Sequence, residues 1–300
     1  MHTLLNRLCL QLQRSSWVFL LTIFVSGCAT QQHINVPGSV PPVDSRKITA
    51  QKVSYPITLG AHRGDSVIHV ENTLAAIHSA RQNPKYKFIE FDVQYSADKQ
   101  AVVFHDSSLR RIFGKNAQVK ETPYEELRRL SENQIPTYEE TMALAVGKPL
   151  NIEIKSQGNQ ADDEQLIDYI MADLKERGIT DQILISSISA EAIKYVKSRH
   201  PEMPTGQIFW VKASTYLPFD FLTEELYDEI HESQANYLML HVANQRNIND
   251  LLRLKPEEKN IVFWDFDDTM FLVHKDPTDR LWSEPPEDPI NEPIQRNAKL

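Results

Sequence analysis

Two segments in which acidic and apolar residues alternate are the first candidates for chemistry. In FIEFDVQ at 88–94, Glu90 and Asp92 alternate with apolar residues, and Glu153 does the same in LNIEIK at 150–155. Side chains alternate between the two faces of a strand, so these acids lie opposite the apolar side chains. Carboxylates that meet in a partly dehydrated place repel one another unless a cation or protons neutralise them. Because oxygen ligands favour hard ions, the three acids predict a site for one divalent cation, Ca²⁺ or Mg²⁺.

Histidines and cations at the ends of predicted strands extend this prediction. His62 closes the segment TLGAH, and His105 closes VVFH. A pair of imidazoles suits proton transfer near neutral pH. Arg63 and Lys155 supply positive charge that suits phosphate oxygens. A metal, two imidazoles and two cations around one place describe a site that cleaves a phosphate ester, because negative charge builds on the nonbridging oxygens.

The elements that must position these residues follow a β/α pattern. Strands are predicted at 58–62, 88–94, 102–105, 150–155, 183–187, 206–211, 237–241, 261–266 and 280–284, with helical stretches between them. About 245 residues from position 56 onward match the ~250 of an eight-stranded β/α barrel. We therefore expect an α/β fold of the TIM-type (β/α)8 barrel class, irregular toward the C-terminus. A doubly wound open sheet is the competing architecture.

Sequence patterns also predict where helices start. In TPYE, Thr122 would cap a helix, Pro123 would hold its first position and Glu125 would close a capping box. The later segment TYEE repeats the box without proline. In ENT, either Asn72 or Thr73 would cap the helix LAAIHSARQ.

The N-terminal segment has the pattern of a bacterial export signal. Arg7 and Arg14 precede the apolar run WVFLLTIFV at 17–25, which is too short to cross a ~30 Å hydrocarbon layer as a helix. The Val-Ser-Gly-Cys that follows resembles a lipobox, which makes Cys28 the acylated first residue of the mature chain. An ordinary secretory signal or an uncleaved anchor is the alternative.

This pattern predicts three parts of the chain and a location. They are a signal peptide at 1–27, a lipid anchor with a flexible, proline-rich tether at 28–55, and the catalytic barrel domain at 56–300. Cys9 leaves with the signal peptide, so no cysteine remains for a disulfide. Ala29 after the acylated cysteine favours the outer membrane. We expect an exported lipoprotein, held at the outer membrane and facing the periplasm.

The composition argues against a nucleic-acid-binding protein. The formal net charge is −9 and the sequence pI is about 5.6, with no basic stripe that could neutralise a row of phosphates. Hydrophobic residues make up 41% of the chain, enough for a sizeable core. No oligomeric state is predicted.

Six short motifs follow the order and approximate spacing of a known family. They are HRG at 62–64, ENT at 71–73, E-x-D at 90–92, HD at 105–106, IPTYEE at 135–140 and IEIK at 152–155. On these motifs the sequence resembles the glycerophosphodiester phosphodiesterases, most strongly over about 57–155. The resemblance implies a β/α barrel that hydrolyses a small-molecule glycerophosphodiester to glycerol 3-phosphate and an alcohol.

Carried over residue by residue, the resemblance gives each candidate a role. It makes Glu90, Asp92 and Glu153 the metal ligands, His62 and His105 the acid–base pair, and Arg63 and Lys155 the cations that hold the phosphate. Glu71 and Trp264 are further candidates, Glu71 to bind or orient groups beside the metal. The sequence departs from the family at LRRIFG, 109–114, and WSEPP, 282–286, so the leaving alcohol stays open.

Other functions are compatible with parts of the sequence. A related phospholipase-D-like barrel would cleave a lysophospholipid or phospholipid, and a barrel without catalysis would be a lipid-anchored binding protein. DFDDT at 265–269 resembles the motif of haloacid-dehalogenase-like phosphatases, with Asp265 as nucleophile, but only about 30 residues follow it. Glu90 and Asp92 taken alone also suit an edge strand that faces water.

Overall fold

The computed structural model describes residues 57–209, 219–241, 251, 255, 259–264 and 269–273. Contacts divide the chain into two units, Met1–Lys52 and Val53–Leu300, and all the described residues belong to the second. The predicted signal peptide, Cys28 and the tether lie outside the described residues, as does Asp265. No helix among the described residues is long and apolar enough to cross a membrane.

The described strands form one sheet. They are β1 Ile57–Ala61, β2 Phe88–Tyr95, β3 Ala101–Val103, β4 Leu150–Ile154, β5 Ile183–Ser187, β6 Thr205–Phe209, β7 Tyr237–His241, β8 Asn260–Trp264 and β9 Thr269–Val273. Their order in the sheet is β1-β9-β8-β7-β6-β5-β4-β2-β3, and β1 also pairs with β2.

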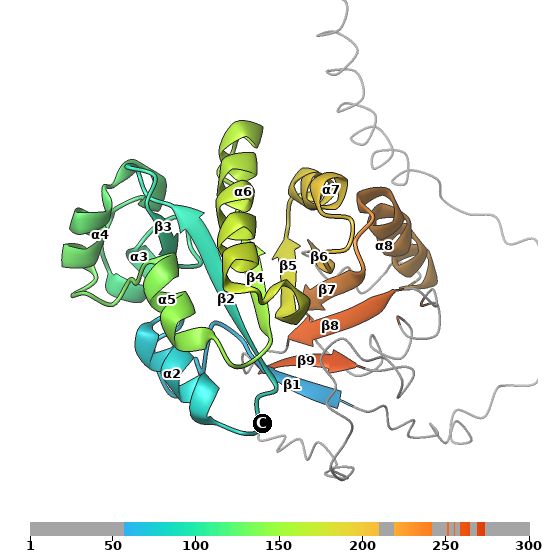
Figure 1. Cartoon of the computed structure of the whole chain (residues 1–300), viewed down its shortest axis with the longest axis horizontal. Helices are drawn as coiled ribbons and strands as arrows, with labels where there is room; N and C mark the ends of the chain where they lie inside the picture. The colour runs from blue at the N-terminus through green and yellow to red at the C-terminus, as the bar shows by residue number, and fades with distance from the viewer. Residues whose placement is uncertain are drawn as a thin grey trace, which may run out of the picture. The chain divides into compact units, whose positions relative to one another are not determined.

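The sheet closes into a barrel because β1 has a partner on each side. It lies parallel to β2, with Ala61 opposite Ile89, and antiparallel to β9, with Ile57 opposite Val273. Around the ring the other strands pair in parallel, except β8 with β9. Eight of the nine described strands, all except β3, thus form a closed barrel whose last strand is antiparallel (Figure 1). This confirms the predicted barrel with its irregular C-terminal part, and the open sheet is excluded.

Strand β9 is not among the strands predicted from the sequence. A regular β/α order has no place for an antiparallel strand directly after β8, so the pattern alone does not identify the apolar run Thr269–Val273 as a strand. The strand predicted at 280–284 lies outside the described residues. The other eight predicted strands are present, with bounds that agree with the predicted ones to within two residues.

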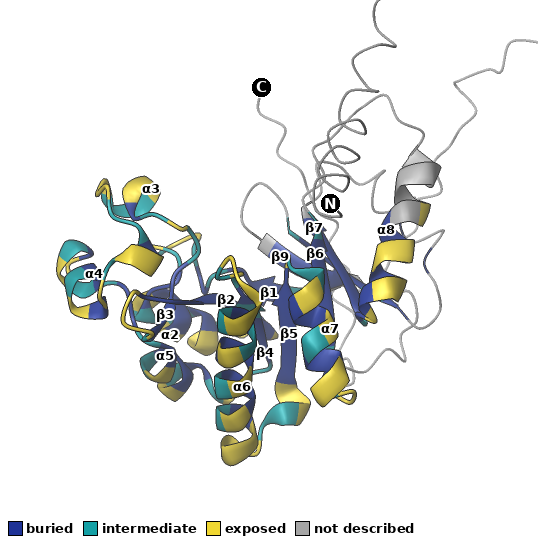
Figure 2. Cartoon of the chain, turned by 90° about the horizontal axis from the view of Figure 1, so that it is seen from above, coloured by how far each residue is buried: buried dark blue, intermediate teal, exposed yellow. Residues whose placement is uncertain are grey.

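Helices cover the outside of the barrel. They are α2 Leu74–Gln82, α3 Arg110–Phe113, α4 Tyr124–Leu130, α5 Tyr138–Ala145, α6 Gln160–Arg177, α7 Ala190–Arg199 and α8 Phe219–Ser233, with short 3-10 turns at Val119–Glu121 and Thr180–Gln182. Figure 2 shows buried strands and helices whose outward faces are exposed. Ile89, Phe91 and Val93 on β2 belong to the main core cluster, together with Ile167 of α6 and Met142 of α5. The apolar face of β2 therefore packs on helices, which leaves its acidic face for the barrel interior.

Two of the three predicted helix starts are confirmed. Thr73 caps α2 and accepts a hydrogen bond from the backbone N–H of Ala76, and Thr137 forms a complete capping box with Glu140 at the start of α5. The box predicted at Thr122 and Glu125 is wrong. The backbone N–H of Thr122 closes the 3-10 turn on Val119, so Pro123 takes the cap position of α4.

The interior of the barrel below the acidic residues is filled by apolar side chains. Phe88 shares a face of β2 with Glu90 and Asp92, and it packs in a cluster with Tyr237 and Met270. Gly60 on β1 is required here, because a Cβ at this position would lie 2.2 Å from the ring of Phe88. The floor of the candidate site is therefore dry and closely packed.

Candidate active site

Strand register brings the three acidic side chains together. Asp92 on β2 lies directly opposite Glu153 on the parallel strand β4. Glu90 lies two residues before Asp92 on β2, so the two side chains share one face of the strand. One carboxylate oxygen from each of the three lies within 4.8 Å of the others. Glu90 and Asp92 are fully buried, whereas Glu153 is half-buried at the rim.

The β1–α2 loop, residues 62–73, places a histidine and an arginine beside this cluster. The loop turns sharply at Arg63, Gly64 and Asn72, whose φ angles are 55°, 75° and 59°. Left-handed backbone is uncommon for residues other than glycine, and it concentrates at functional sites. A Cβ on Gly64 would lie 2.7 Å from the backbone of Ala76 in α2, so only glycine fits there.

Hydrogen bonds hold the two ends of the loop against each other. The backbone N–H of Asn72 donates to the carbonyl of Arg63 (2.8 Å), and that of Gly64 donates to the carbonyl of Glu90 (3.0 Å). The buried carboxylate of Asp65 accepts hydrogen bonds from Tyr86 (2.8 Å) and Ser79 (2.9 Å). The loop is thus a preformed support rather than a loose connection.

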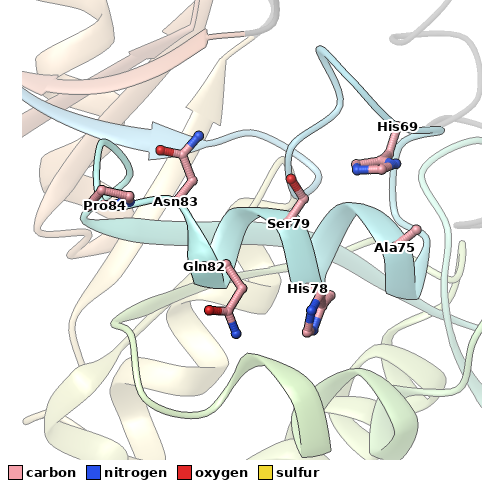
Figure 3. Close-up of a pocket in the computed structure, with 7 residues that line it drawn as sticks. All are labelled: His69, Ala75, His78, Ser79, Gln82, Asn83 and Pro84. Carbon is pink, nitrogen blue, oxygen red and sulfur yellow. The ribbon is translucent and has the colours of Figure 1, made fainter.

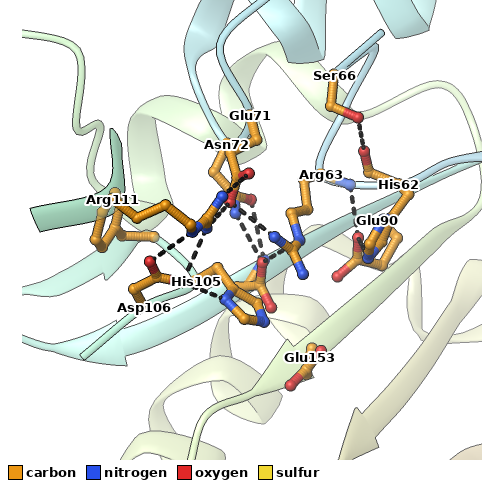
Figure 4. A network of polar contacts seen from close by, with 12 residues as sticks. His62, Arg63, Ser66, Glu71, Asn72, Glu90, His105, Asp106, Arg111 and Glu153 are labelled. Carbon is orange, nitrogen blue, oxygen red and sulfur yellow. Dashed lines mark hydrogen bonds and ion pairs between the residues drawn. The ribbon is translucent and has the colours of Figure 1, made fainter. Parts of the chain in front are cut away.

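The acidic cluster is surrounded by donors. The backbone N–H of Arg63 donates to Glu90 Oε2 (2.6 Å), and the Asn72 amide donates to Asp92 Oδ2 (2.7 Å). Lys155 Nζ lies 2.9 Å from Asp92 Oδ1 and also contacts Glu153 Oε1. Figure 4 shows Arg63 and Asn72 beside Glu90 in this network.

Burial and repulsion shift the pKa values of the three acids in different directions. Burial, together with Asp92 and Glu153, raises the pKa of Glu90 well above its usual range. Burial and Asp92 raise the pKa of Glu153 to about 7, although Lys155 opposes this shift. Burial would also raise the pKa of Asp92, but the charges of Lys155, His105 and Arg63 outweigh it and lower the value. Burial and mutual repulsion therefore oppose full ionisation of the three acids, and positive charge added among them would favour it.

These residues fit a divalent cation. The donor set is three carboxylates, which hard ions prefer. Glu90 Oε1 is buried and accepts no hydrogen bond from the described residues, so this oxygen can serve as a ligand to a cation. The buried Nε of Arg63 likewise donates no hydrogen bond among the described residues, which leaves a donor for an anion beside the same cluster.

His105 reaches the site by a route that differs from the predicted one. Strand β3 runs antiparallel to β2 and is not part of the barrel ring, with Val103 opposite Val93. The chain passes the carboxyl end of β2, turns and comes back, and the backbone N–H of Phe104 donates to the carbonyl of Asp92 (3.1 Å). A folded-back hairpin, rather than the end of a barrel strand, therefore carries His105 to the level of Asp92.

The two imidazoles have different neighbours. His62 Nε2 lies 3.9 Å from Glu90 Oε2, and its ring stacks on Trp264 with centroids 5.9 Å apart. His105 Nδ1 lies 2.7 Å from Asp106 Oδ1. Burial, with the charge of Lys155, lowers the pKa of His105, and the neighbouring Asp92 opposes this shift.

Asp106 and Arg111 are site residues to which the sequence assigned no role. Arg111 donates to both oxygens of Asp106 and, through NH1 and NH2, to both oxygens of Glu71 (2.7 Å each). Glu71 in turn accepts a hydrogen bond from Arg63 (2.8 Å). Glu71 therefore orients two arginines and is not one of the three clustered acids. The HD motif at 105–106 could have identified Asp106 from the sequence. Arg111 could not be found in this way, because it lies in the segment that departs from the family pattern.

Hollows on the surface of the described residues include one on the outer face of α2 and one beside His105. One, of about 510 Å³, lies along the outer face of α2 between His69 and Pro84, and none of the predicted site residues lines it (Figure 3). The other, of about 820 Å³, begins at His105 and Asp106 and extends over α3. The second hollow is continuous with the candidate site.

The sequence model of the glycerophosphoryl diester phosphodiesterase family matches residues 62–269. The chain belongs to this family. Human lysophospholipase D is 30% identical over 204 residues, which are 60% of this chain and 62% of that protein. A glycerophosphodiester phosphodiesterase from Caldanaerobacter subterraneus is 32% identical over 163 residues, 50% of this chain and 65% of that protein. The chain thus matches less than two thirds of the length of these relatives.

Solved structures of family members share the fold. A phosphodiesterase from Oleispira antarctica, in complex with the product sn-glycerol-3-phosphate, is 24% identical and aligns with a TM-score of 0.55 over 70% of this chain and 84% of that chain. A glycerophosphodiester phosphodiesterase from Thermotoga maritima is 22% identical, with a TM-score of 0.52 over 69% of this chain and 85% of that chain. These likenesses support the barrel described above.

Proposed function

We propose that this protein hydrolyses glycerophosphodiesters to glycerol 3-phosphate and an alcohol, with one bound divalent cation. The observation that carries the proposal is the convergence of Glu90, Asp92 and Glu153 beside two imidazoles and two cations. Membership of the family and the relatives named glycerophosphodiester phosphodiesterase support it. When bound at the three carboxylates, the cation supplies charge that stabilises phosphoryl oxygens as negative charge builds on them.

Residues of the chain bind the phosphate and transfer the protons. Lys155 and the Arg63 guanidinium, whose Nε has no hydrogen-bond partner among the described residues, hold the phosphate. Because Asp106 accepts the Nδ1–H of His105, the neutral ring of His105 presents Nε2 for proton transfer. His62 is the second proton-transfer group, on the Glu90 side of the cluster. One histidine assists attack on phosphorus by water or by the substrate's neighbouring hydroxyl, and the other protonates the leaving alcohol. If the hydroxyl attacks, a water molecule must then open the cyclic phosphate to give glycerol 3-phosphate.

Release of glycerol 3-phosphate from glycerophosphocholine, with and without EDTA, tests this function. We expect EDTA to abolish turnover, and the His62→Ala and His105→Ala variants to lose about 10²-fold or more in kcat while they stay folded. Turnover that resists chelation removes the cation from the proposal. Retained turnover in both variants removes the acid–base assignment, and no turnover of any diester favours a lipid-anchored binding protein.

A lysophospholipid is a second candidate substrate, favoured by the surface of the β1–α2 loop. The middle of this loop exposes Val67 (60%), Ile68 (67%) and Val70 (42%), while its ends carry His62, Arg63 and Glu71. Three aliphatic side chains held out beside the site suit an acyl chain on the glycerol arm. Human lysophospholipase D is among the relatives.

The paired substitution Val67→Ser with Ile68→Ser separates the two candidates. If an acyl chain binds there, kcat/KM falls for lysophosphatidylcholine and stays unchanged for glycerophosphocholine. Ile188→Ser, at another exposed aliphatic residue (52%) beyond the end of β5, is the control. An equal effect on both substrates, or on neither, argues against acyl recognition by this loop.

We also propose that the chain is a lipoprotein at the outer membrane, facing the periplasm. The support is the N-terminal pattern alone, with its apolar run at 17–25 and the lipobox that ends at Cys28. Mass spectrometry of the mature N-terminus after expression in a Gram-negative host, with Cys28→Ser as control, tests it. A mature chain that begins elsewhere, or that carries no acyl group, excludes the anchor.

A further inference from the structure

We propose that the hollow beside His105 binds the alcohol arm of the diester and selects neutral polyol or anionic headgroups over cationic ones. This inference rests on the proposed hydrolase function and adds a substrate class to it. We call the hollow, with its lining residues His105, Arg110, Asn116 and Gln118 and two serines, the headgroup groove. Asp106 and Arg111 also line it.

The walls of the headgroup groove are preformed. The backbone N–H of Leu109 donates to the carbonyl of Ala117 (3.0 Å), and that of Val119 donates to the carbonyl of Ser107 (2.9 Å). Leu109 and Val119 are fully buried in a separate apolar cluster with Phe104. This packing fixes the backbone on both sides of the groove, so the polar side chains above it project from a rigid base.

The position of the groove matches one arm of a phosphodiester. A phosphate held by Arg63 and Lys155 has two ester arms. His105 lines the groove and is also close enough to both cations to interact with their charges. The other direction, toward His62 and Trp264, is the side of the β1–α2 loop. The groove measures about 820 Å³, which is ample for a headgroup larger than glycerol. We therefore assign the variable alcohol to the groove and the glycerol to the opposite side.

The charge of the groove decides which alcohols fit. Both oxygens of Asp106, the one carboxylate among the described lining residues, are engaged by Arg111 and His105. Arg110 is exposed and forms no ion pair with any described residue, so its guanidinium is available to a ligand. The described lining otherwise offers amides and hydroxyls, which hydrogen-bond to polyols.

A cationic headgroup finds little to bind in this groove. Quaternary ammonium groups are recognised by aromatic faces and by carboxylates. Among the described lining residues the only ring is the imidazole of His105, and the only carboxylate is already paired with Arg111. Arg110 would repel choline. It would attract a second phosphate carried on the headgroup, and it would hydrogen-bond to the hydroxyls of inositol.

Steady-state kinetics on four diesters tests the proposal with the full-length, acyl-free protein in Ca²⁺ or Mg²⁺. We expect kcat/KM to be higher for glycerophosphoinositol and for a diester whose glycerol headgroup carries a second phosphate than for glycerophosphocholine and glycerophosphoethanolamine. Arg110→Glu should lower the first two values about fivefold and leave the choline value unchanged or raised. Lys120→Glu, an exposed cation on the same segment that does not line the groove, controls for a general change of surface charge.

Several outcomes would overturn the proposal. An equal loss on all four diesters in Arg110→Glu would place the common glycerol in the groove, and no loss, or a preference for choline, would leave the groove without a role in selection. If the wild-type protein turns over none of the diesters, the hydrolase function fails separately. Equilibrium binding of glycerophosphoinositol and glycerophosphocholine then decides: selective binding that depends on Arg110 keeps the groove assignment, and unselective or absent binding removes it.

Discussion

The candidate site combines three acids whose charges cannot all be present without a counter-charge. Asp92 is the centre of this arrangement, because it contacts Lys155 and accepts a hydrogen bond from Asn72. Its lowered pKa, set by nearby cations against the effect of burial, contrasts with the raised values of Glu90 and Glu153. At the scale of single residues, the site is organised around this one carboxylate.

Replacing Asp92 by Asn should nearly abolish turnover. The change removes one ligand charge and leaves Lys155 and Arg63 without their shared partner, so we expect kcat/KM to fall about 10³-fold. Kinetics on glycerophosphocholine measures this loss, and Asp98→Asn, in the turn between β2 and β3, is the matched control. Equal activity in Asp92→Asn and the wild type would contradict a role for Asp92 at the site.

Replacing Asp106 by Asn should act on the chemical step and little on substrate affinity. The variant keeps the size of the side chain but loses the charge that orients His105 and engages Arg111. We expect kcat to fall about 10-fold to 10²-fold with KM changed by less than threefold. Asp98→Asn, in the turn between β2 and β3, is again the control. A rise in KM with kcat unchanged would show that Asp106 acts on binding instead.

At the scale of elements, alternation and capping account for most of the features that the sequence predicted. Alternation in two strands placed Glu90, Asp92 and Glu153 on interior faces, and parallel register then brought them together. The Thr73 and Thr137 caps result from local hydrogen bonds, which neighbouring residues determine. Such features depend on residues close in sequence or on a single periodicity.

The features that the sequence did not predict depend on distant parts of the chain. The antiparallel direction of β9 is set by its pairing with both β1 and β8. The return of β3 alongside β2 decides where His105 lies, and no local pattern specifies that direction. Arg111 contacts Glu71, 40 residues away in the sequence, so its role appears only in the folded chain.

The tight turn of the β1–α2 loop predicts a difference between two glycines. Gly64 and Gly114 both have positive φ, 75° and 67°, but a Cβ on Gly114 meets nothing within 4 Å. Gly114→Ala should therefore cost about 1 kcal/mol in the free energy of unfolding for its backbone alone. Gly64→Ala adds a clash with the backbone of Ala76 and should cost about 2 kcal/mol more.

Urea unfolding of both glycine variants measures this difference. Turnover should fall in Gly64→Ala as well, because the turn carries Arg63 to Glu90. It should stay near the wild-type value in Gly114→Ala. Equal free energies of unfolding for the two variants would show that α2 can move away from the loop.

At the scale of the whole molecule, the cation is expected to stabilise the barrel. It would join β2 and β4 through Asp92 and Glu153 and relieve the repulsion among buried acids. Saturating Ca²⁺ or Mg²⁺, at about 100 times the Kd, should raise Tm by about 5 °C or more over the EDTA-treated protein. Differential scanning calorimetry measures this shift, and it should vanish in Asp92→Asn. A shift of the same size in that variant would place the bound cation elsewhere.

The pairing of Ile57 with Val273 joins the first and last described strands of the chain. A ring of strands closed in this way has a high contact order, since more than 200 residues must be made before β1 gains its second partner. Until then both β1 and β8 have open edges that can pair with other chains. A nascent chain of this protein therefore depends on being kept apart from its neighbours until synthesis has passed β9, and a chain cut short before that strand is prone to aggregate.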